Sequence, residues 1–215
     1  MTYKAVIFDL DGTLVNSIED IADAMNTVLQ TYNFPTHDYD TYKTFVGSGV
    51  KSLVIKSLPE GERQDNQVKN CHTAMMNIYK NQCTNKTKPY DGIVELLDAL
   101  KSTDLKMSIL SNKADALTKK VVSTLFSDYF NPVLGLKIEA HKKPNPIVAL
   151  EICATLGLDP EQVIYVGDTG IDIKTAKNAN MMAVGVSWGF RNKEELIENG
   201  ANHILEKPLD LMAIL

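Results

Sequence analysis

After Pro89, short apolar runs alternate with segments in which apolar residues recur at helical spacing. Strands that alternate with helices in this way predict a parallel sheet with helices on both of its faces. One more apolar run, Ala5–Phe8, lies far upstream and is typical of a buried strand closed by a glycine-containing turn. The later expected strands are residues 105–110, Val133–Leu136, residues 163–166 and residues 183–186. The sequence therefore predicts an α/β fold with a Rossmann-like parallel sheet.

The stretch between the first expected strand and the alternating region shows helical patterns and no convincing strand. Its first helix is expected to begin after Ser17, with Asp20 three residues later as the partner in a capping box. A long polar helix is expected to close the stretch. We therefore expect an inserted α-helical cap domain, residues 15–85. The Rossmann-like core would consist of residues 1–14 and 86–215.

Composition limits the classes of function. The chain has 215 residues, 44% of them hydrophobic, and a formal net charge of −5. The acidic balance argues against nucleic acid and anionic membranes as partners. No apolar run reaches the roughly 18 residues of a membrane span, and no signal peptide is expected. The three cysteines are odd in number and lack CxxC spacing, so we expect free thiols. The expectation is a cytoplasmic protein, monomeric or homodimeric.

The first strand ends in two carboxylates, Asp9 and Asp11. In open parallel sheets the ligand site lies beyond the carboxyl ends of the strands. Residues two apart on a strand point the same way, so these two side chains leave the strand end together. Two close carboxylates repel each other and need a cation or a shared proton. Because Mg²⁺ prefers oxygen ligands, the pair indicates a magnesium site.

Later strand ends supply groups that suit a phosphate. A hydroxyl such as that of Ser111 can donate to a phosphate oxygen, and Asn112 follows it. Lys143 offers a cation on a backbone that nearby prolines stiffen. Its neighbour Lys142 is an alternative, although the prolines favour Lys143. These groups lie just after apolar runs, where a ligand is expected.

Two further aspartates follow another strand. Asp168 stands directly after a glycine at the strand end, and Asp172 comes four residues later. Residues four apart lie one helical turn from each other, so both carboxylates can face one site. Together with the first aspartate pair, they predict a cluster of acidic groups at one edge of the sheet.

Four short motifs contain these residues: DLDGTL at 9–14, SN at 111–112, KPNP at 143–146 and GDTGID at 167–172. In order and placement, over the whole chain, this set resembles the four motifs of the haloacid dehalogenase superfamily. The long insert after the first motif resembles the helical cap of its phosphatase branch. One departure is Asn16, where the family often has Asp, and this position lies outside the catalytic set.

The resemblance implies a magnesium-dependent phosphatase that works through an aspartyl-phosphate. It makes Asp9 the nucleophile, and it makes Asp11 the acid for the leaving alkoxide and the base for the hydrolytic water. Magnesium would bind Asp9, the main-chain carbonyl of Asp11, and Asp168. Asp172 would hold the metal directly or through water. The groups expected to bind phosphoryl oxygens are Ser111, Asn112 and Lys143.

Within the superfamily the strongest resemblance is to phosphoglycolate phosphatases. It rests on VGSG at residues 46–49 and VSWGF at residues 186–190, and it implies a small phosphorylated metabolite as the substrate. Glycine lets the backbone approach a ligand closely, so cap residues Gly47, Ser48 and Gly49 are expected to set substrate choice. A helix-breaking turn explains the same glycines equally well.

Two other enzymes with this fold remain alternatives. A β-phosphoglucomutase-like mutase would use basic cap residues such as Lys43, Lys51 and Lys56 to hold a distal phosphate, and a pyrophosphatase shares the fold. Dehalogenase and phosphonatase chemistry fit less well, because neither calls for an acid at the position of Asp11. A non-catalytic phosphate-binding regulator would not need the intact set of aspartates.

Overall fold

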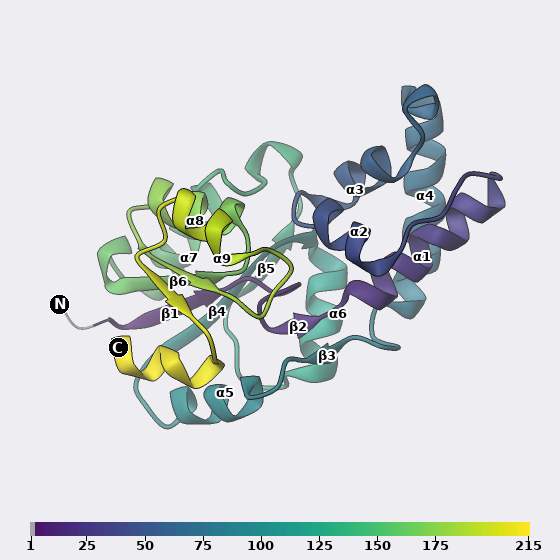
Figure 1. Ribbon diagram of the computed structural model, residues 1–215. Coiled ribbons are helices and arrows are strands. Elements are labelled where there is room, and N and C mark those ends of the chain that lie inside the picture. Colours follow the sequence, from purple (N-terminus) through teal and green to yellow (C-terminus); the bar gives the residue numbers. More distant parts are fainter. Residues whose placement is uncertain (1–2) are drawn as a thin grey trace.

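A six-stranded parallel sheet forms the centre of the computed structural model, which describes residues 3–215 (Figure 1). The strands stand in the order β5-β4-β1-β6-β7-β8. This arrangement confirms the predicted α/β fold with a parallel sheet, and it adds the edge strand β8, which was not predicted. The strands are β1 (Ala5–Phe8), β4 (Lys106–Ala114), β5 (Val133–Leu136), β6 (Val163–Gly167), β7 (Met182–Val186) and β8 (His203–Leu205).

Helices cover both faces of the sheet because the side chains of the central strand alternate between them. Val6 and Phe8 pack in one hydrophobic cluster with α5 and α6. Ala5 and Ile7 pack in a second cluster with α7 and α8 on the opposite face. All four side chains are buried, as expected for a central parallel strand. The core helices are α5 (Ile93–Lys101), α6 (Asp115–Leu125), α7 (Ile147–Leu156), α8 (Gly170–Asn178) and α9 (Lys193–Glu198), with short 3₁₀ turns at Glu139–His141, Pro160–Gln162 and Pro208–Ile214.

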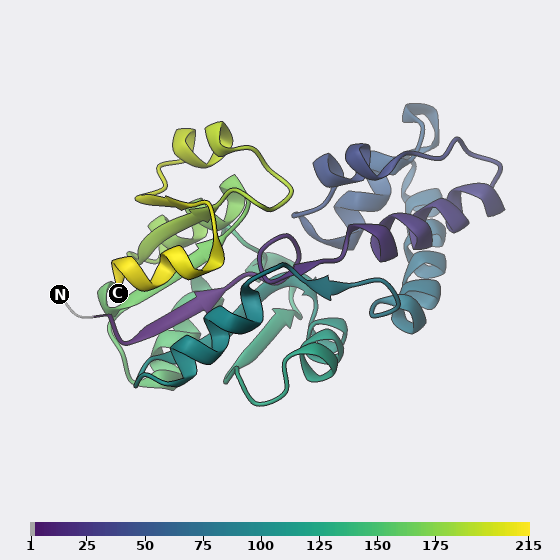
Figure 2. The ribbon, with the colours of Figure 1, turned by 60° about the horizontal axis from the view of Figure 1, so that its bottom comes forward.

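The inserted segment forms a separate helical lobe beside the sheet (Figures 1 and 2). Within residues 17–87, all of which the structure describes, there are helices and no strand. The domain bounds given above, with the cap at residues 15–85, stay a prediction. The helices of this lobe, called the cap from here on, are α1 (Ile18–Thr31), α2 (Tyr39–Phe45), α3 (Gly49–Ser57) and α4 (Asp65–Gln82), with a 3₁₀ turn at Glu60–Glu62.

The two chain crossings between core and cap lie side by side. They form a short antiparallel ribbon of β2 (Val15–Asn16) and β3 (Lys88–Pro89). Val15 pairs with Pro89 in this ribbon. The cap is therefore attached through two adjacent, hydrogen-bonded segments.

The prediction of a capping box at Ser17 and Asp20 is wrong. The Ser17 side chain makes no cap hydrogen bond, and its buried hydroxyl has no partner among the described residues. The buried carboxylate of Asp20 instead accepts hydrogen bonds from the main-chain N–H groups of Lys86 and Thr87, at 3.0 and 2.8 Å. It also accepts one from the Thr87 hydroxyl at 2.7 Å. Contacts with a segment that is distant in sequence thus replace the expected local cap. They link the start of α1 to Lys86 and Thr87, where the chain passes back from the cap to the core.

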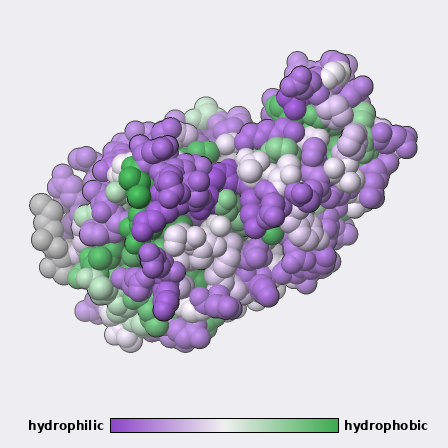
Figure 3. Space-filling model, viewed as in Figure 1, coloured by the Kyte–Doolittle hydropathy of each residue, from purple (hydrophilic) through white to green (hydrophobic). Residues whose placement is uncertain are grey.

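Apolar side chains are mostly inside the protein. In the view of Figure 3, hydrophilic residues cover most of the surface, and hydrophobic residues form only smaller patches. Among residues 3–215, none of the helices combines the length and the apolar character needed to cross a membrane. The cysteines are buried free thiols, as predicted, at Cys71, Cys83 and Cys153.

Candidate active site

The predicted site residues meet at the carboxyl edge of the sheet. Strand β1 lies between β4 and β6, so the chain leaves the sheet in opposite directions on its two sides. Ligands of open α/β sheets bind at such a switch point. The end of β1 carries Asp9 and Asp11, and β4 carries Ser111 and Asn112. Asp168 follows β6 at the same edge.

A buried lysine stands between two of the aspartates. The Nζ of Lys143 lies 2.9 Å from Asp9 Oδ1 and 2.7 Å from Asp172 Oδ1. Asp9 Oδ1 is buried, yet it accepts no well-aligned hydrogen bond from any residue that the structure describes. Lys142 pairs instead with Glu139 at the surface. The structure therefore brings Lys143, and not its neighbour, to the site.

Asp168 is held rigidly at the end of β6. Its two carboxylate oxygens accept hydrogen bonds from the Thr13 hydroxyl at 3.3 Å and from the main-chain N–H of Phe190 at 2.8 Å. Gly12 lies against it with φ of +89°, and a Cβ on Gly12 would come within 2.2 Å of an Asp168 oxygen. Only glycine combines this backbone conformation with this close approach. The turn after β1 is thus shaped around the Asp168 carboxylate.

Asp172 is equally restrained. One of its oxygens bonds Lys143, and the other accepts hydrogen bonds from the Thr169 hydroxyl at 2.7 Å and the Thr169 N–H at 3.1 Å. Thr169 and Asp172 form a capping box that fixes the start of α8. The hydrogen bonds that cap the start of α8 therefore also orient the Asp172 carboxylate toward the site.

The acidic cluster suits a divalent cation. Asp9, Asp168 and Asp172 each offer an oxygen, and these three atoms lie within 4.8 Å of one another. With Lys143 as their buried cation, three ionised carboxylates leave two negative charges unbalanced. Because Asp9 Oδ1 also accepts no well-aligned hydrogen bond from the described residues, this set of oxygen donors fits a hard metal ion. The residues of this chain could hold such an ion at the end of β1.

Burial raises the pKa of Asp9 to about 7, and the charges of Asp172 and Asp11 add to this effect against the opposing charge of Lys143. Burial also raises the pKa of Asp168 well above its usual range, with contributions from Asp172 and Asp9. For Lys143, burial alone would lower the pKa, but the Asp172 and Asp9 charges raise it well above its ordinary value. Without a further cation the site therefore favours extra protons.

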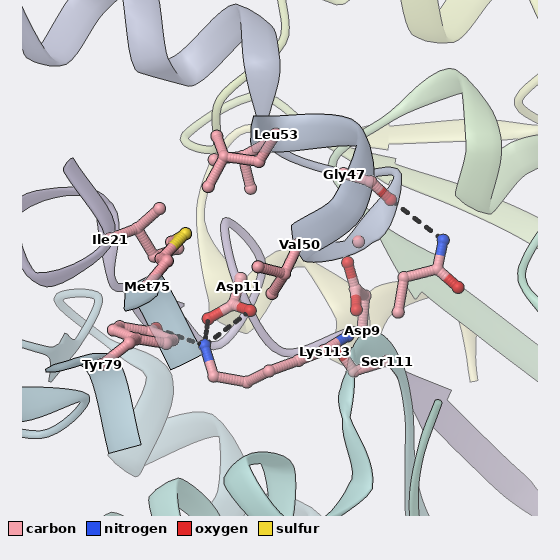
Figure 4. Close-up of a pocket in the computed structure, with 13 residues that line it drawn as sticks. Asp9, Asp11, Ile21, Gly47, Val50, Leu53, Met75, Tyr79, Ser111 and Lys113 are labelled. Atoms are coloured by element: carbon pink, nitrogen blue, oxygen red, sulfur yellow. Dashed lines mark hydrogen bonds and ion pairs between the residues drawn. The ribbon is translucent and has the colours of Figure 1, made fainter. Parts of the chain in front are cut away.

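The Asp11 side chain points toward Lys113 (Figure 4). Lys113 Nζ lies 2.8 and 2.9 Å from the two Asp11 oxygens and donates to the hydroxyl of Tyr79 at 2.6 Å. The two carboxylates of the first motif thus have different partners, which suits them to different tasks.

The side chain of Asn112 binds protein groups. Its Nδ2 donates to the carbonyl of Gly47 at 2.9 Å and to that of Lys143 at 3.3 Å, and its Oδ1 accepts from the Lys143 N–H at 2.9 Å. Asn112 therefore orients Lys143 and contacts the cap. Ser111, beside it, lines the cavity above Asp9.

A cavity of about 50 Å³ lies between the cap and the carboxyl edge of the sheet. Gly47 and Gly49 line it, and among residues 3–215 the lining does not include Ser48, Lys43, Lys51 or Lys56. Its core side carries the polar groups named above. The cap side is mostly apolar and consists of Ile21, Val46, Gly47, Gly49, Val50, Leu53, Met75 and Tyr79.

A family model described as haloacid dehalogenase-like hydrolase matches residues 6–186. The chain belongs to the haloacid dehalogenase-like hydrolases. This membership confirms the resemblance drawn from the four motifs.

Relatives within the haloacid dehalogenase-like hydrolases match along nearly the whole chain. The chain is 33% identical over 214 residues to a phosphoglycolate phosphatase of Aquifex aeolicus, covering 99% of this chain and 96% of the relative. It is 31% identical over 203 residues to a phosphoglycolate phosphatase of Psychrobacter arcticus, covering 91% and 88%. A crystal structure from Lactobacillus delbrueckii subsp. bulgaricus, provisionally named a phosphoglycolate phosphatase, superimposes with a TM-score of 0.92 at 30% identity, covering 100% and 99%.

Three residues near the site of this haloacid dehalogenase-like hydrolase were not predicted. Lys113 lies two residues after Ser111 in β4, which extends farther than expected. The two-residue period of a strand could have indicated that both side chains share a face. Tyr79 in α4 contacts Lys113, and Arg191 after β7 donates to the carbonyl of Val46 in the cavity lining. Both contacts depend on the packing of the cap on the core, and no local pattern marks them.

Proposed function

We propose that this hydrolase is a magnesium-dependent phosphatase that hydrolyses a small phosphate monoester through an aspartyl-phosphate on Asp9. The observation that carries the proposal is the environment of Asp9. Its buried carboxylate lies beside Lys143 and two further carboxylates, with one oxygen unpartnered by hydrogen bonding. A carboxylate that lines a cavity and is fixed by its neighbours is suited to nucleophilic attack on a phosphoryl group bound there.

In the first half-reaction, an Asp9 oxygen attacks phosphorus, the Asp9–phosphoryl bond forms and the ester P–O bond breaks. The leaving alkoxide takes a proton from Asp11. In the second half-reaction, water attacks the phosphoryl group, Asp11 accepts a proton from that water, and inorganic phosphate leaves with Asp9 restored.

Magnesium would be held by Asp9, the main-chain carbonyl of Asp11, and Asp168, with Asp172 supporting the site directly or through water. Bound there, it supplies positive charge that offsets the repulsion between two anions. Lys143 supplies a second positive charge from the protein itself. It is fixed by two carboxylates and by the Asn112 contact to its main-chain N–H. Ser111 adds a hydroxyl at the cavity wall.

A phosphoglycolate-like ester is the proposed substrate class. Two relatives that match nearly the full chain are named phosphoglycolate phosphatases, and the cavity under the cap is small. The mutase alternative has less support, because the described cap lysines Lys43, Lys51 and Lys56 do not line this cavity. Gly47 and Gly49, in the lining, remain our candidates for substrate choice. A cytoplasmic location stays part of the proposal, supported by the buried free thiols.

A panel of phosphate compounds tests the proposal. Purified protein with Mg²⁺ is assayed for release of phosphate from phosphoglycolate, sugar phosphates, nucleotides and pyrophosphate, and for isomerisation of the sugar phosphates. We expect phosphate release with the highest kcat/KM on a small monoester, and none from the Asp9→Asn variant. Isomerisation without net phosphate release would identify a mutase instead, and a clear preference for pyrophosphate would overturn the monoester assignment.

A further inference from the structure

Lys113 joins a core carboxylate to a cap hydroxyl. Its Nζ contacts both oxygens of Asp11, at 2.8 and 2.9 Å, and donates to Tyr79 Oη at 2.6 Å. Asp11 follows β1 and Lys113 lies in β4, whereas Tyr79 comes from α4 of the cap (Figure 4). The contact therefore links the two lobes at the group that we propose as the proton donor.

These contacts leave Lys113 no capacity to bind a substrate. An ammonium has three N–H donors, and the two Asp11 oxygens and the Tyr79 hydroxyl provide three acceptors. The Lys113 side chain is 2% exposed and that of Asp11 is 11% exposed. The ammonium also lies 4.8 Å from the centre of the Tyr79 ring. Lys113 is thus suited to fixing its neighbours.

The surroundings make the linkage sensitive to the cap position. Ile21 and Met75 of the cap lie in the same cavity wall as Tyr79. Closing this apolar surface over Asp11 limits the water that would weaken the ion pair. When the cap moves away, Tyr79 leaves with it, and the long lysine side chain regains rotamer freedom.

We propose that Lys113 and Tyr79 are positioning residues that hold the carboxyl group of Asp11 in its reactive place while the cap is closed. The inference rests on the proposed function, in which Asp11 protonates the leaving group. Proton transfer requires heavy atoms within about 2.6–3.2 Å, so a carboxyl group free to turn transfers its proton less often. Cap closure is in this way coupled to proton transfer as well as to the exclusion of water.

Four variants separate positioning from simple stabilisation. Tyr79→Phe removes the hydroxyl and keeps the ring, and Lys113→Met removes the ammonium and keeps most of the side-chain length. The matched controls are Tyr42→Phe, whose hydroxyl bonds Asn26 inside the cap, and Lys120→Met, whose ammonium bonds the Lys80 carbonyl between the lobes. Thermal unfolding of each variant with Mg²⁺ identifies any that fail to fold.

The measurement is the rate of phosphoenzyme formation by rapid quench, on an alkyl phosphate and on p-nitrophenyl phosphate. An alkoxide needs protonation to leave, whereas p-nitrophenolate needs little. We expect Tyr79→Phe to slow the alkyl reaction about tenfold and Lys113→Met to slow it about a hundredfold. Both variants should change the aryl reaction much less, and both controls should stay near wild type.

A double substitution sharpens the test. In an Asp11→Asn background there is no proton donor left to position, so adding Tyr79→Phe or Lys113→Met should cause no further loss on the alkyl phosphate. Equal losses on the two esters, or losses that multiply with that of Asp11→Asn, would overturn the inference. A wild-type protein that releases no phosphate from any ester would instead defeat the proposed function, which the first assay reveals separately.

Discussion

The guanidinium Nη2 of Arg191 lies 2.7 Å from the main-chain oxygen of Val46, although the two residues belong to different lobes. The same side chain also donates to the carbonyls of Lys43 and Thr44 near the end of α2. The last carbonyls of a helix have no partner within the helix. One core arginine therefore satisfies the exposed end of a cap helix and holds the cap against the core.

Substituting Arg191 should favour the open cap. We expect Arg191→Met to raise KM about tenfold, because several hydrogen bonds to the cap disappear together, with a smaller effect on kcat. Amide hydrogen exchange should become faster at residues 39–46. Arg191→Lys should give an intermediate result, since lysine lacks the planar fork of donors. The control is Lys193→Met, which loses an exposed pair with Glu206. An unchanged KM and exchange pattern would show that Arg191 does not hold the cap.

Substitutions of the two aspartates of the first motif should impair different steps of the reaction. Asp9→Asn should form no phosphoenzyme with any ester, because an amide cannot become an acyl phosphate. Asp11→Asn keeps the nucleophile and should retain relatively more phosphoenzyme formation on an aryl than on an alkyl phosphate. Its dephosphorylation should be slow with both, so phosphoenzyme accumulates in a burst. Phosphorylation of the Asp9→Asn protein, detected by rapid quench, would contradict these roles.

Activity should require a divalent cation. Treatment with EDTA should reduce phosphate release to background, and added Mg²⁺ should restore it, because the carboxylates around Asp9 repel an incoming phosphate. Asp168→Asn should need more Mg²⁺ for half-maximal activity, and direct titration by calorimetry should show weaker binding. Full turnover in protein shown by elemental analysis to be metal-free would disprove the requirement.

The stability of the metal-free protein should fall as the pH rises toward neutrality. Burial raises the pKa of Asp9 from 3.8 to about 7. Between these two pH values the folded protein holds a proton that the unfolded chain has lost, so rising pH favours unfolding. The raised pKa of Asp168 acts in the same direction. Chemical denaturation from pH 5 to 8 should show this decline, and saturating Mg²⁺ should reduce it. A metal-free protein that is more stable at pH 8 than at pH 5 would refute the prediction.

A bulky residue at Gly49 should change substrate choice at a cost in stability. Gly49 has φ of +78°, and a Cβ there would lie 3.3 Å from the Asn112 carbonyl oxygen. The left-handed conformation alone costs a residue with a side chain about 1–2 kcal/mol. We expect Gly49→Val to lose more kcat/KM on larger esters than on smaller ones. A uniform loss across the panel would point to impaired cap closure, and Gly61→Val, at a site with open space around it, serves as the control.

The sequence predicted the parts of the fold that depend on short-range patterns. Ala5–Phe8 is apolar at every position because both faces of the central strand are covered, and such a run is recognisable without any partner. The edge strand His203–Leu205 has three residues and an exposed histidine, so it carries no comparable signal. The capping box at Ser17 failed because Asp20 has stronger partners in a segment far along the chain.

The site was predictable where it follows from sheet geometry. Strand ends of a parallel sheet converge, so Asp9, Ser111 and Asp168 could be grouped before their contacts were known. Tyr79 and Arg191 could not be grouped with them. Their positions depend on how the cap helices lie against the core, and this orientation is set by many side chains at once.

The ribbon of β2 and β3 has a consequence for how such a protein can change over generations. Asn16 stands opposite Lys88, and paired antiparallel residues are roughly 5 Å apart, a gap that a two-residue turn can close. The cap is thus an inserted segment whose two ends lie next to each other. In evolution the cap could be lengthened, replaced or deleted without rerouting any strand of the sheet. Substrate selectivity can then diverge while the core residues that are proposed to carry the phosphoryl chemistry stay the same.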